Sequence, residues 1–204
     1  MDITDKPTKV RESEELNLKV VEAFVKENIP GLSGELAVEQ FPSGYSNLTY
    51  LIRVGDRELV LRRPPFGRKA KTAHDMGREF RILKALNPVF PYCPKPLAYT
   101  EDESLMECPF YVMERIQGII LRRNPPKGLE FTPHQMRSLC ENLLDVHHRL
   151  HSVDYKAIGL EGFGKPEGYV RRQVEGWSGR YLAARMPSAT TSRITRSSFL
   201  AASI

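Results

Sequence analysis

Short runs of apolar and β-branched residues, separated by turn residues, are the feature that most limits how this chain can fold. Three such runs follow one another at Leu36–Phe41, Leu48–Val54 and Glu58–Arg62. The pair Gly55-Asp56 between the second and third runs is typical of a two-residue hairpin turn. The sequence therefore predicts a three-stranded antiparallel meander in this region.

A helix and two further strands complete the predicted sheet. Apolar residues recur at helical spacing over Ala73–Leu86, which predicts a helix there. Four prolines between Pro88 and Pro96 then forbid regular helix. Strands are expected at Leu97–Thr100 and Phe110–Met113, with an acidic turn at residues 101–103 between them. The prediction is an α+β fold, a five-stranded antiparallel sheet with a helix packed on one face.

Helices are also expected before and after this sheet. Ser13 is placed to cap a helix that ends near Asn28. Thr132 begins a stronger candidate, because Pro133 follows it and a glutamine completes a capping box. Apolar spacing extends that helix to His151.

The last part of the chain changes in character. A short helix is expected from Gly168 to about Tyr181. From Leu182 onward the chain is rich in Ser, Thr, Ala and Arg, and it has no acidic residue and no apolar period. Such a segment buries too little apolar surface to offset the entropy of ordering it, so residues 182–204 are expected to be disordered.

Composition excludes several classes of protein. The net charge of +5 does not indicate nucleic-acid binding, because acidic residues stop at Glu175 and the tail alone supplies part of the excess. No stretch approaches the roughly 20 apolar residues of a membrane span. The charged N-terminus does not resemble a secretory signal. Three widely separated cysteines fit reduced thiols, so we expect a cytoplasmic protein.

Polar residues in the loop between the first two strands are suited to binding phosphate. Gly44 permits a close approach of the backbone. Ser43, Ser46 and Asn47 supply donors for phosphate oxygens. An ordinary hairpin loop has the same composition, so this loop alone decides nothing.

The third strand places a cation beside this loop. Alternation along a strand puts Val60 and Arg62 on one face, and the leucines between and before them on the other. Arginine is always charged and can bind phosphate through two hydrogen bonds. Glu79 follows in the predicted helix, where its carboxylate could hold Arg62 by an ion pair. A surface arginine and a solvated glutamate are the alternatives.

The run FYVMERIQG describes a strand that leaves the sheet toward a linker. The backbone of Met113, Glu114 and Ile116 could meet the edge of an adenine base, and Gly118 would allow a turn. Taken alone, this run describes only a buried strand.

The order of these motifs resembles the aminoglycoside phosphotransferase/choline kinase family, in the branch associated with acyl-CoA dehydrogenases. The motifs are GYSN, VLRRPP, REFRIL, PKPL, FYVMERIQG and LLDVHHRLHSVD, and the resemblance extends from Leu36 to Tyr181. It implies a protein-kinase-like fold with ATP and Mg²⁺ as cofactors. The implied reaction is phosphoryl transfer to a hydroxyl group of a small molecule, and the branch suggests an acyl compound.

The resemblance also implies a division of the chain. Residues 1–35 would be an N-terminal helical extension, 36–115 the kinase-like N-lobe, 116–181 a linker with the first helices of the C-lobe, and 182–204 a disordered or aberrant tail. The nucleotide-binding residues would be those named above: Ser43, Gly44, Ser46, Asn47, Val60, Arg62, Glu79, Met113, Glu114 and Ile116.

The family's catalytic loop has the pattern H-G-D-x-x-x-x-N, and this pattern is missing from the 204 residues. No catalytic residue and no metal ligand is therefore assigned, and the chain is expected to be an inactive fragment of a kinase. One alternative is a noncatalytic nucleotide-binding or regulatory module that a partner completes. Another is an RNA- or membrane-associated protein that uses the basic residues Arg62, Arg63, Arg68, Lys69 and Lys71.

Overall fold

The computed structural model describes residues 4–42, 47–67, 74–121, 124–165 and 167–185, and the chain divides into two compact units between Glu161 and Gly162. The first unit contains α1 (Leu18–Asn28), β1 (Leu36–Gln40), β2 (Leu48–Val54), β3 (Arg57–Arg63), α2 (Met76–Leu86), β4 (Pro96–Thr100), α3 (Glu103–Met106), β5 (Phe110–Glu114) and α4 (Pro133–His151). The second contains α5 (Tyr169–Ala184), and a 3₁₀ turn, Glu161–Phe163, spans the division.

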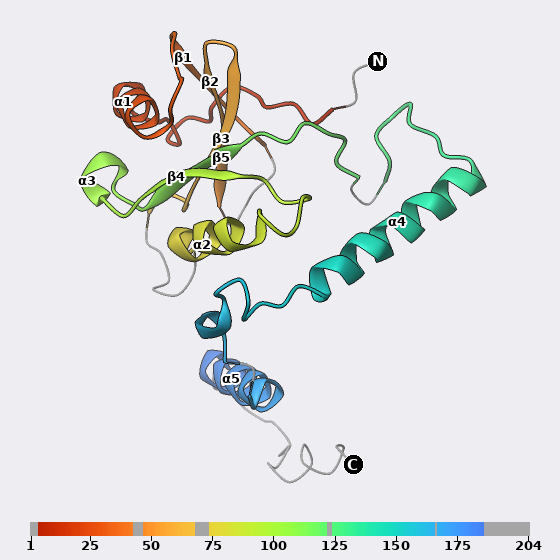
Figure 1. Cartoon of the computed structure of the whole chain (residues 1–204). Coiled ribbons are helices and arrows are strands. Elements are labelled where there is room, and N and C mark those ends of the chain that lie inside the picture. The colour runs from red at the N-terminus through yellow and green to blue at the C-terminus, as the bar shows by residue number, and fades with distance from the viewer. Residues whose placement is uncertain (1–3, 43–46, 68–73, 122–123, 166, 186–204) are drawn as a thin grey trace, which may run out of the picture. The chain divides into compact units, whose positions relative to one another are not determined.

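The five strands form one antiparallel sheet in the order β1-β2-β3-β5-β4 (Figure 1). The predicted meander is confirmed, because β1 pairs with β2 and β2 with β3 in antiparallel register. β5 then lies between β3 and β4, which sets Val60 opposite Met113. This pairing brings the end of β5 beside the middle of β3, the region in which sequence placed a binding site.

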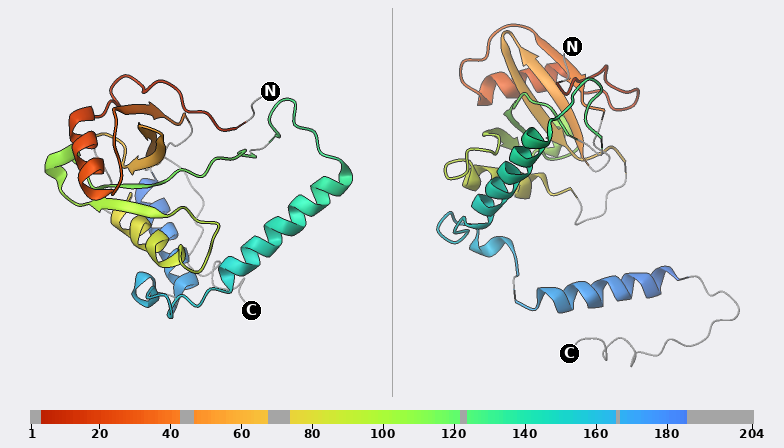
Figure 2. Two further views of the ribbon diagram at one scale, coloured as in Figure 1. Left: turned by 45° about the horizontal axis from the view of Figure 1, so that its top comes forward. Right: turned by 90° about the vertical axis from the view of Figure 1, so that its right-hand side faces the viewer.

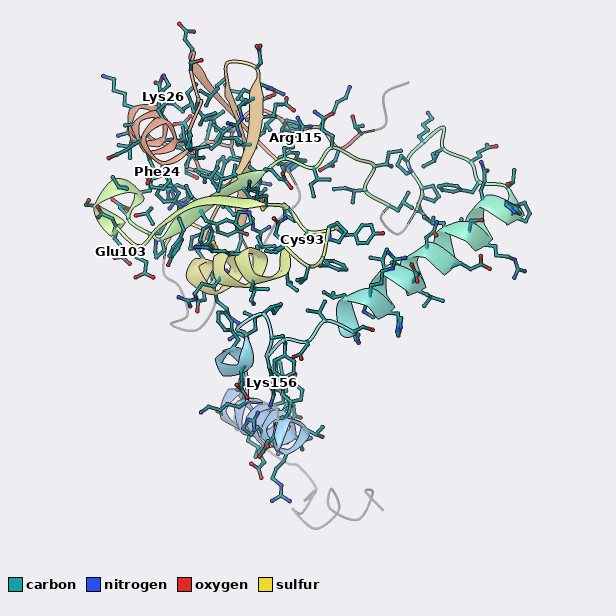
Figure 3. The ribbon with its side chains drawn as sticks, in the orientation of Figure 1. Phe24, Lys26, Cys93, Glu103, Arg115 and Lys156 are labelled. Atoms are coloured by element: carbon teal, nitrogen blue, oxygen red, sulfur yellow. The ribbon has the colours of Figure 1, made fainter. Side chains whose placement is uncertain are left out.

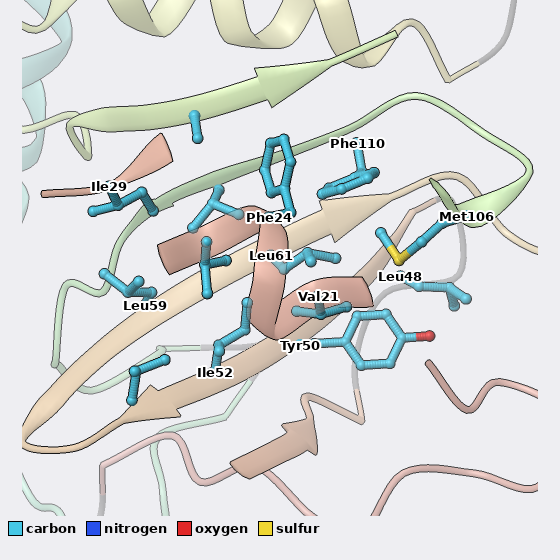
Figure 4. Close-up of a cluster of buried hydrophobic side chains, with 14 of the residues drawn as sticks. Val21, Phe24, Ile29, Leu48, Tyr50, Ile52, Leu59, Leu61, Met106 and Phe110 are labelled. Atoms are coloured by element: carbon cyan, nitrogen blue, oxygen red, sulfur yellow. The ribbon is translucent and has the colours of Figure 1, made fainter. Parts of the chain in front are cut away.

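A hydrophobic core fills the face of the sheet covered by α1. Leu59 and Leu61 are at most 2% exposed and pack with Phe24 of α1 and Phe110 of β5 (Figure 4). The two phenylalanine rings meet edge to face, with centroids 4.7 Å apart. Full burial of such a side chain contributes roughly 1.5–3 kcal/mol, so α1 is an integral part of this unit's core.

The opposite face of the sheet carries α2. The ring of Phe80 stacks on Tyr99 of β4, with centroids 5.3 Å apart. Gly77 lets the helix approach this closely, because a Cβ atom there would lie 2.5 Å from the Tyr99 hydroxyl. Helix α2 is thus held over β4 and β5, where its side chains can reach the end of β3.

Two predicted helix starts were wrong. Ser13 does not cap α1, because its φ of +70° places it outside the helix, and Asn17 caps the helix by accepting from the Val20 N–H. Helix α2 begins at Met76, after Asp75 caps it by accepting from the Arg78 N–H at 2.8 Å. Ala73, the predicted start, lies outside the described residues.

Other boundaries were predicted with mixed success. The capping box at Thr132 and the end of α4 at His151 are confirmed. The acidic turn at residues 101–103 leads into a helical turn, α3, which Asp102 caps. Helix α5 continues through Ala184, so residues 182–184, expected to be disordered, are helical. Residues from 186 onward lie outside the described part. Among the described helices, none is both long and apolar enough to cross a membrane.

Gly55→Ala is expected to destabilise the sheet more than Gly31→Ala. Both glycines have positive φ (+56° and +76°), which costs an L-residue roughly 1–2 kcal/mol. A Cβ at Gly55 would also lie 2.5 Å from the Ser33 carbonyl oxygen, whereas nothing lies within 4 Å of one at Gly31. Urea unfolding of both variants measures the difference, and equal losses would contradict the close approach of Gly55 to Ser33.

Candidate functional site

A cavity of about 510 Å³ lies beside β3 and the segment that follows β5. Five of the residues predicted from sequence line it: Val60, Arg62, Met113, Glu114 and Ile116. The strand pairing explains this grouping, because Arg62 lies opposite Tyr111, and Val60 opposite Met113. Ile116, Ile119 and Ile120 also line the cavity, so its lining combines apolar side chains with the cationic group of Arg62.

Arg62 is held by an ion pair from α2. Its Nε donates to Oε2 of Glu79 at 3.2 Å, which confirms the contact predicted from the alternation of β3. Arg63, the next residue of β3, points away from this pair. It is 3% exposed, donates from Nε to the Pro64 carbonyl, and stacks its guanidinium 3.7 Å from the centre of the Phe66 ring.

The Glu79 carboxylate accepts hydrogen bonds from three donors. Besides Arg62, it accepts from the Tyr111 hydroxyl at 2.9 Å and from Nδ2 of Asn47 at 2.8 Å. Burial raises the pKa of Tyr111 well above its usual value, so this hydroxyl keeps its proton and donates. Two strands and the loop before β2 therefore converge on one carboxylate, which fixes Arg62 relative to the cavity.

Asn47 extends this network to His74. Since a carboxylate only accepts, the Asn47 amide nitrogen faces Glu79 and its oxygen faces Nδ1 of His74, 2.7 Å away. Asn47 was predicted as a site residue, and it is 8% exposed. Ser43, Gly44 and Ser46, predicted in the same loop, lie outside the described residues. His74 and Tyr111 were not predicted.

The segment after β5, residues 115–120, is called the linker below. Arg115 donates to Oε2 of Glu58 at 2.5 Å, and Gln117 donates to the same oxygen at 2.9 Å (Figure 3 labels Arg115). Glu58 also accepts from Arg53, and this contact, with its neighbouring donors, lowers the Glu58 pKa below its ordinary value. An ionised Glu58 thus ties the linker to β3 beside the cavity.

No group of three or more His, Cys, Asp or Glu side chains in the described part could hold a metal ion. His147 and His151 lie one turn apart on α4 with ring centroids 4.4 Å apart, but they form a pair only. The arrangement at the cavity is suited to binding an anionic ligand that has a flat apolar part.

Comparison with known proteins agrees with this geometry. The phosphotransferase enzyme family model matches residues 37–200, a range that continues past Tyr181, where the sequence resemblance was taken to end. The fold resembles a presumed aminoglycoside phosphotransferase of Ralstonia eutropha, with a TM-score of 0.70 and 31% identity. That match covers 85% of this chain and 50% of the solved one.

Curated relatives are much longer proteins. Acyl-CoA dehydrogenase family member 11 of Rattus norvegicus is 34% identical over 90% of this chain, and family member 10 of Mus musculus is 42% identical over 76%. The chain spans 24% and 14% of their respective lengths. With most of its length matched by the family model and its sheet matched by a kinase-like structure, this chain belongs to the phosphotransferase enzyme family.

Proposed function

We propose that the cavity binds ATP and that the chain is the nucleotide-binding part of a small-molecule phosphotransferase acting on a hydroxyl group. The observation that carries this proposal is the position of Arg62. It lines the same cavity as Val60 and Ile116, and Glu79 holds it from α2. A base needs apolar contacts and a phosphate needs a cation, and one ligand that combines a base with phosphates is a nucleotide.

The described residues would divide the binding of ATP among them. The base would lie between Val60 and the apolar linker residues, with its edge against the backbone of Glu114 to Ile116. Arg62 would neutralise charge on the phosphates, because guanidinium groups bind phosphate oxygens in a planar, two-point geometry. Glu79 would keep the guanidinium from turning away, and the loop that ends at Asn47 would cover the phosphates.

ATP supplies the phosphoryl group, and its transfer depends on placing an acceptor hydroxyl in line with that group. The 204 residues lack the H-G-D-x-x-x-x-N pattern that the family uses for this step. The described part also offers no set of metal ligands, so no residue is assigned to Mg²⁺. The chain by itself is therefore proposed to bind nucleotide without transferring phosphate.

The acceptor is proposed to be a hydroxylated acyl compound. This choice depends on the names of the curated relatives, which are acyl-CoA dehydrogenase family members. The missing catalytic pattern also favours a second candidate, a noncatalytic nucleotide-binding module that a partner completes. Both candidates require the same cavity, and they differ in turnover once the partner is present.

Calorimetric titration with Mg-ATP tests the proposal. Arg62→Ala should weaken binding roughly tenfold, the equivalent of about 1.4 kcal/mol, because it removes the cation from the cavity. Arg57→Ala is the matched control, since Arg57 belongs to the same strand but is exposed and donates only to the Pro30 carbonyl among the contacts described. It should leave the affinity within about twofold.

Three outcomes decide between the candidates. Saturable binding that Arg62→Ala weakens, without hydrolysis of ATP, supports the nucleotide-binding proposal. Absence of binding by a folded chain would refute it. ATP turnover well above that of a buffer control would show that catalytic residues lie within this chain.

A further inference from the structure

The segment Thr4–Glu14, which precedes α1 and is called the strap here, lies before the region that the family model matches. It is the red stretch between the N-terminus and α1 in Figures 1 and 2. The strap contacts the sheet edge at one end and the cavity at the other. These contacts suggest a role for the strap, which lies outside the residues that the family model matches.

Gln40, at the end of edge strand β1, is the strap's main anchor. Its backbone exchanges two hydrogen bonds with that of Thr8, each 2.8 Å long. Its side chain is 1% exposed, accepts from the Arg11 N–H at 3.0 Å, and donates to a carboxylate oxygen of Glu14. A glutamine amide buried this fully needs partners, and among the contacts described the strap provides them.

Tyr50 of β2 provides a second anchor. Its ring is fully buried in the core, and its hydroxyl donates to the Glu14 carbonyl at 2.8 Å. Burial raises the pKa of Tyr50 far above its usual value, so the hydroxyl remains a donor. Arg11 adds a contact from Nη2 to the Pro42 carbonyl at 2.6 Å, at the start of the loop that leads to Asn47.

The other end of the strap reaches the linker. The Asp5 N–H donates to the Gly118 carbonyl at 3.2 Å, and Asp5 and Gly118 both line the cavity. Glu58 holds the linker from β3 at Arg115 and Gln117. The strap therefore holds the linker at a second point, and it connects the linker to the anchors at Gln40 and Tyr50.

We propose that the strap is a positioning element of the nucleotide cavity, which holds the linker in the shape that binds the base. This proposal depends on the proposed function of the cavity. A linker held only by Glu58 would sample other conformations. The nucleotide would then bind only the fraction of molecules whose linker has the conformation that fits the base. By reciprocity, bound nucleotide must stabilise the attached strap as much as the strap favours binding.

Deletion of residues 2–11 is the direct test, with Gln40→Leu and Tyr50→Phe as variants that keep the chain length. Glu12→Ala is the matched control, since Glu12 is exposed in the strap. Mg-ATP affinity should fall roughly five- to tenfold on deletion and roughly threefold in each single variant, as the competent fraction of linker shapes falls. The control should match the unaltered chain.

Trypsin cleavage after Lys9 and Arg11 provides a readout that a merely stabilising strap would not give. Saturating Mg-ATP should slow this cleavage at least threefold in the unaltered chain, but not in Gln40→Leu. The strap proposal would be overturned if the deletion and both single variants bound Mg-ATP as tightly as the unaltered chain. It would also be overturned if Mg-ATP did not change the rate of cleavage. Neither result would contradict the proposed function of the cavity. Absence of ATP binding by the unaltered chain would overturn the function of the cavity as well.

Discussion

Leu61→Ala is expected to lower the free energy of unfolding of the sheet-containing unit by roughly 2–5 kcal/mol. Leu61 has no exposed surface and lies on the face of β3 that packs against α1 (Figure 4). Shortening it removes buried methyl groups and leaves a cavity that Phe24 and Phe110, already in edge-to-face contact, are poorly placed to fill. Urea-induced unfolding, followed by circular dichroism, measures the loss.

Leu143→Ala is the control of identical chemistry, because Leu143 on α4 is 67% exposed. This variant should lower the free energy of unfolding by no more than about 0.5 kcal/mol. Val60→Ala, one position before Leu61, should lower nucleotide affinity as well as stability, since Val60 lines the cavity and is 7% exposed. A Leu61→Ala loss below about 1 kcal/mol would mean that Leu61 is not part of a tightly packed core.

The face of the sheet to which each strand residue points could be predicted from sequence, because side chains alternate between the two faces along a strand. Val60 and Arg62 were placed on one face, and the structure has both in the cavity lining. Glu79 was placed opposite Arg62 from the predicted helix, and the ion pair is present. In both cases local geometry and one assumed packing arrangement were sufficient.

Helix starts were less predictable, since a capping side chain competes with its neighbours. Ser13 and Asn17 are both good N-cap residues, and the choice depends on the backbone. Ser13 has positive φ, and the strap's Glu14 binds Gln40 and Tyr50, so the chain turns into the helix only at Asn17. Contacts that distant in sequence decide the start, and no local pattern contains them.

The same reason explains the site residues that sequence missed. His74 meets Asn47 across 27 residues, and Tyr111 meets Glu79 across 32. Asp5 enters the cavity wall through a bond to Gly118. Each contact depends on the order in which strands pair, and a single sequence gives little information on that order.

Glu79→Ala is expected to weaken Mg-ATP binding about tenfold and also to destabilise the fold by roughly 1–3 kcal/mol, the cost of leaving buried donors unpaired. The variant leaves Arg62, Asn47 and the Tyr111 hydroxyl without the carboxylate they share. Tyr111 is 2% exposed and Asn47 8%, so water replaces the lost acceptor poorly. Calorimetric titration and urea unfolding measure the two effects separately.

Glu22→Ala is the matched control for the loss of an ion pair. Glu22 pairs with Lys26 on α1, where both side chains are 36% exposed, and such pairs contribute roughly 0.2–1 kcal/mol. Glu22→Ala should leave ATP affinity unchanged and should lower stability by no more than that range. If Glu79→Ala behaved like Glu22→Ala, the carboxylate would be an ordinary surface group and not the centre of the site.

Glu79→Gln separates charge from shape, because glutamine keeps one acceptor oxygen but presents an N–H₂ group where the second oxygen was. In either orientation of the amide this group faces a donor, either Arg62 and Tyr111 at the Oε2 position or Nδ2 of Asn47 at the Oε1 position. Binding should therefore fall nearly as far as in Glu79→Ala. In the Arg62→Ala background the Glu79→Gln substitution should add little to the loss, because two residues that act through one contact are not additive. Full additivity in this double-mutant cycle would mean that Glu79 acts on the nucleotide by a route other than Arg62.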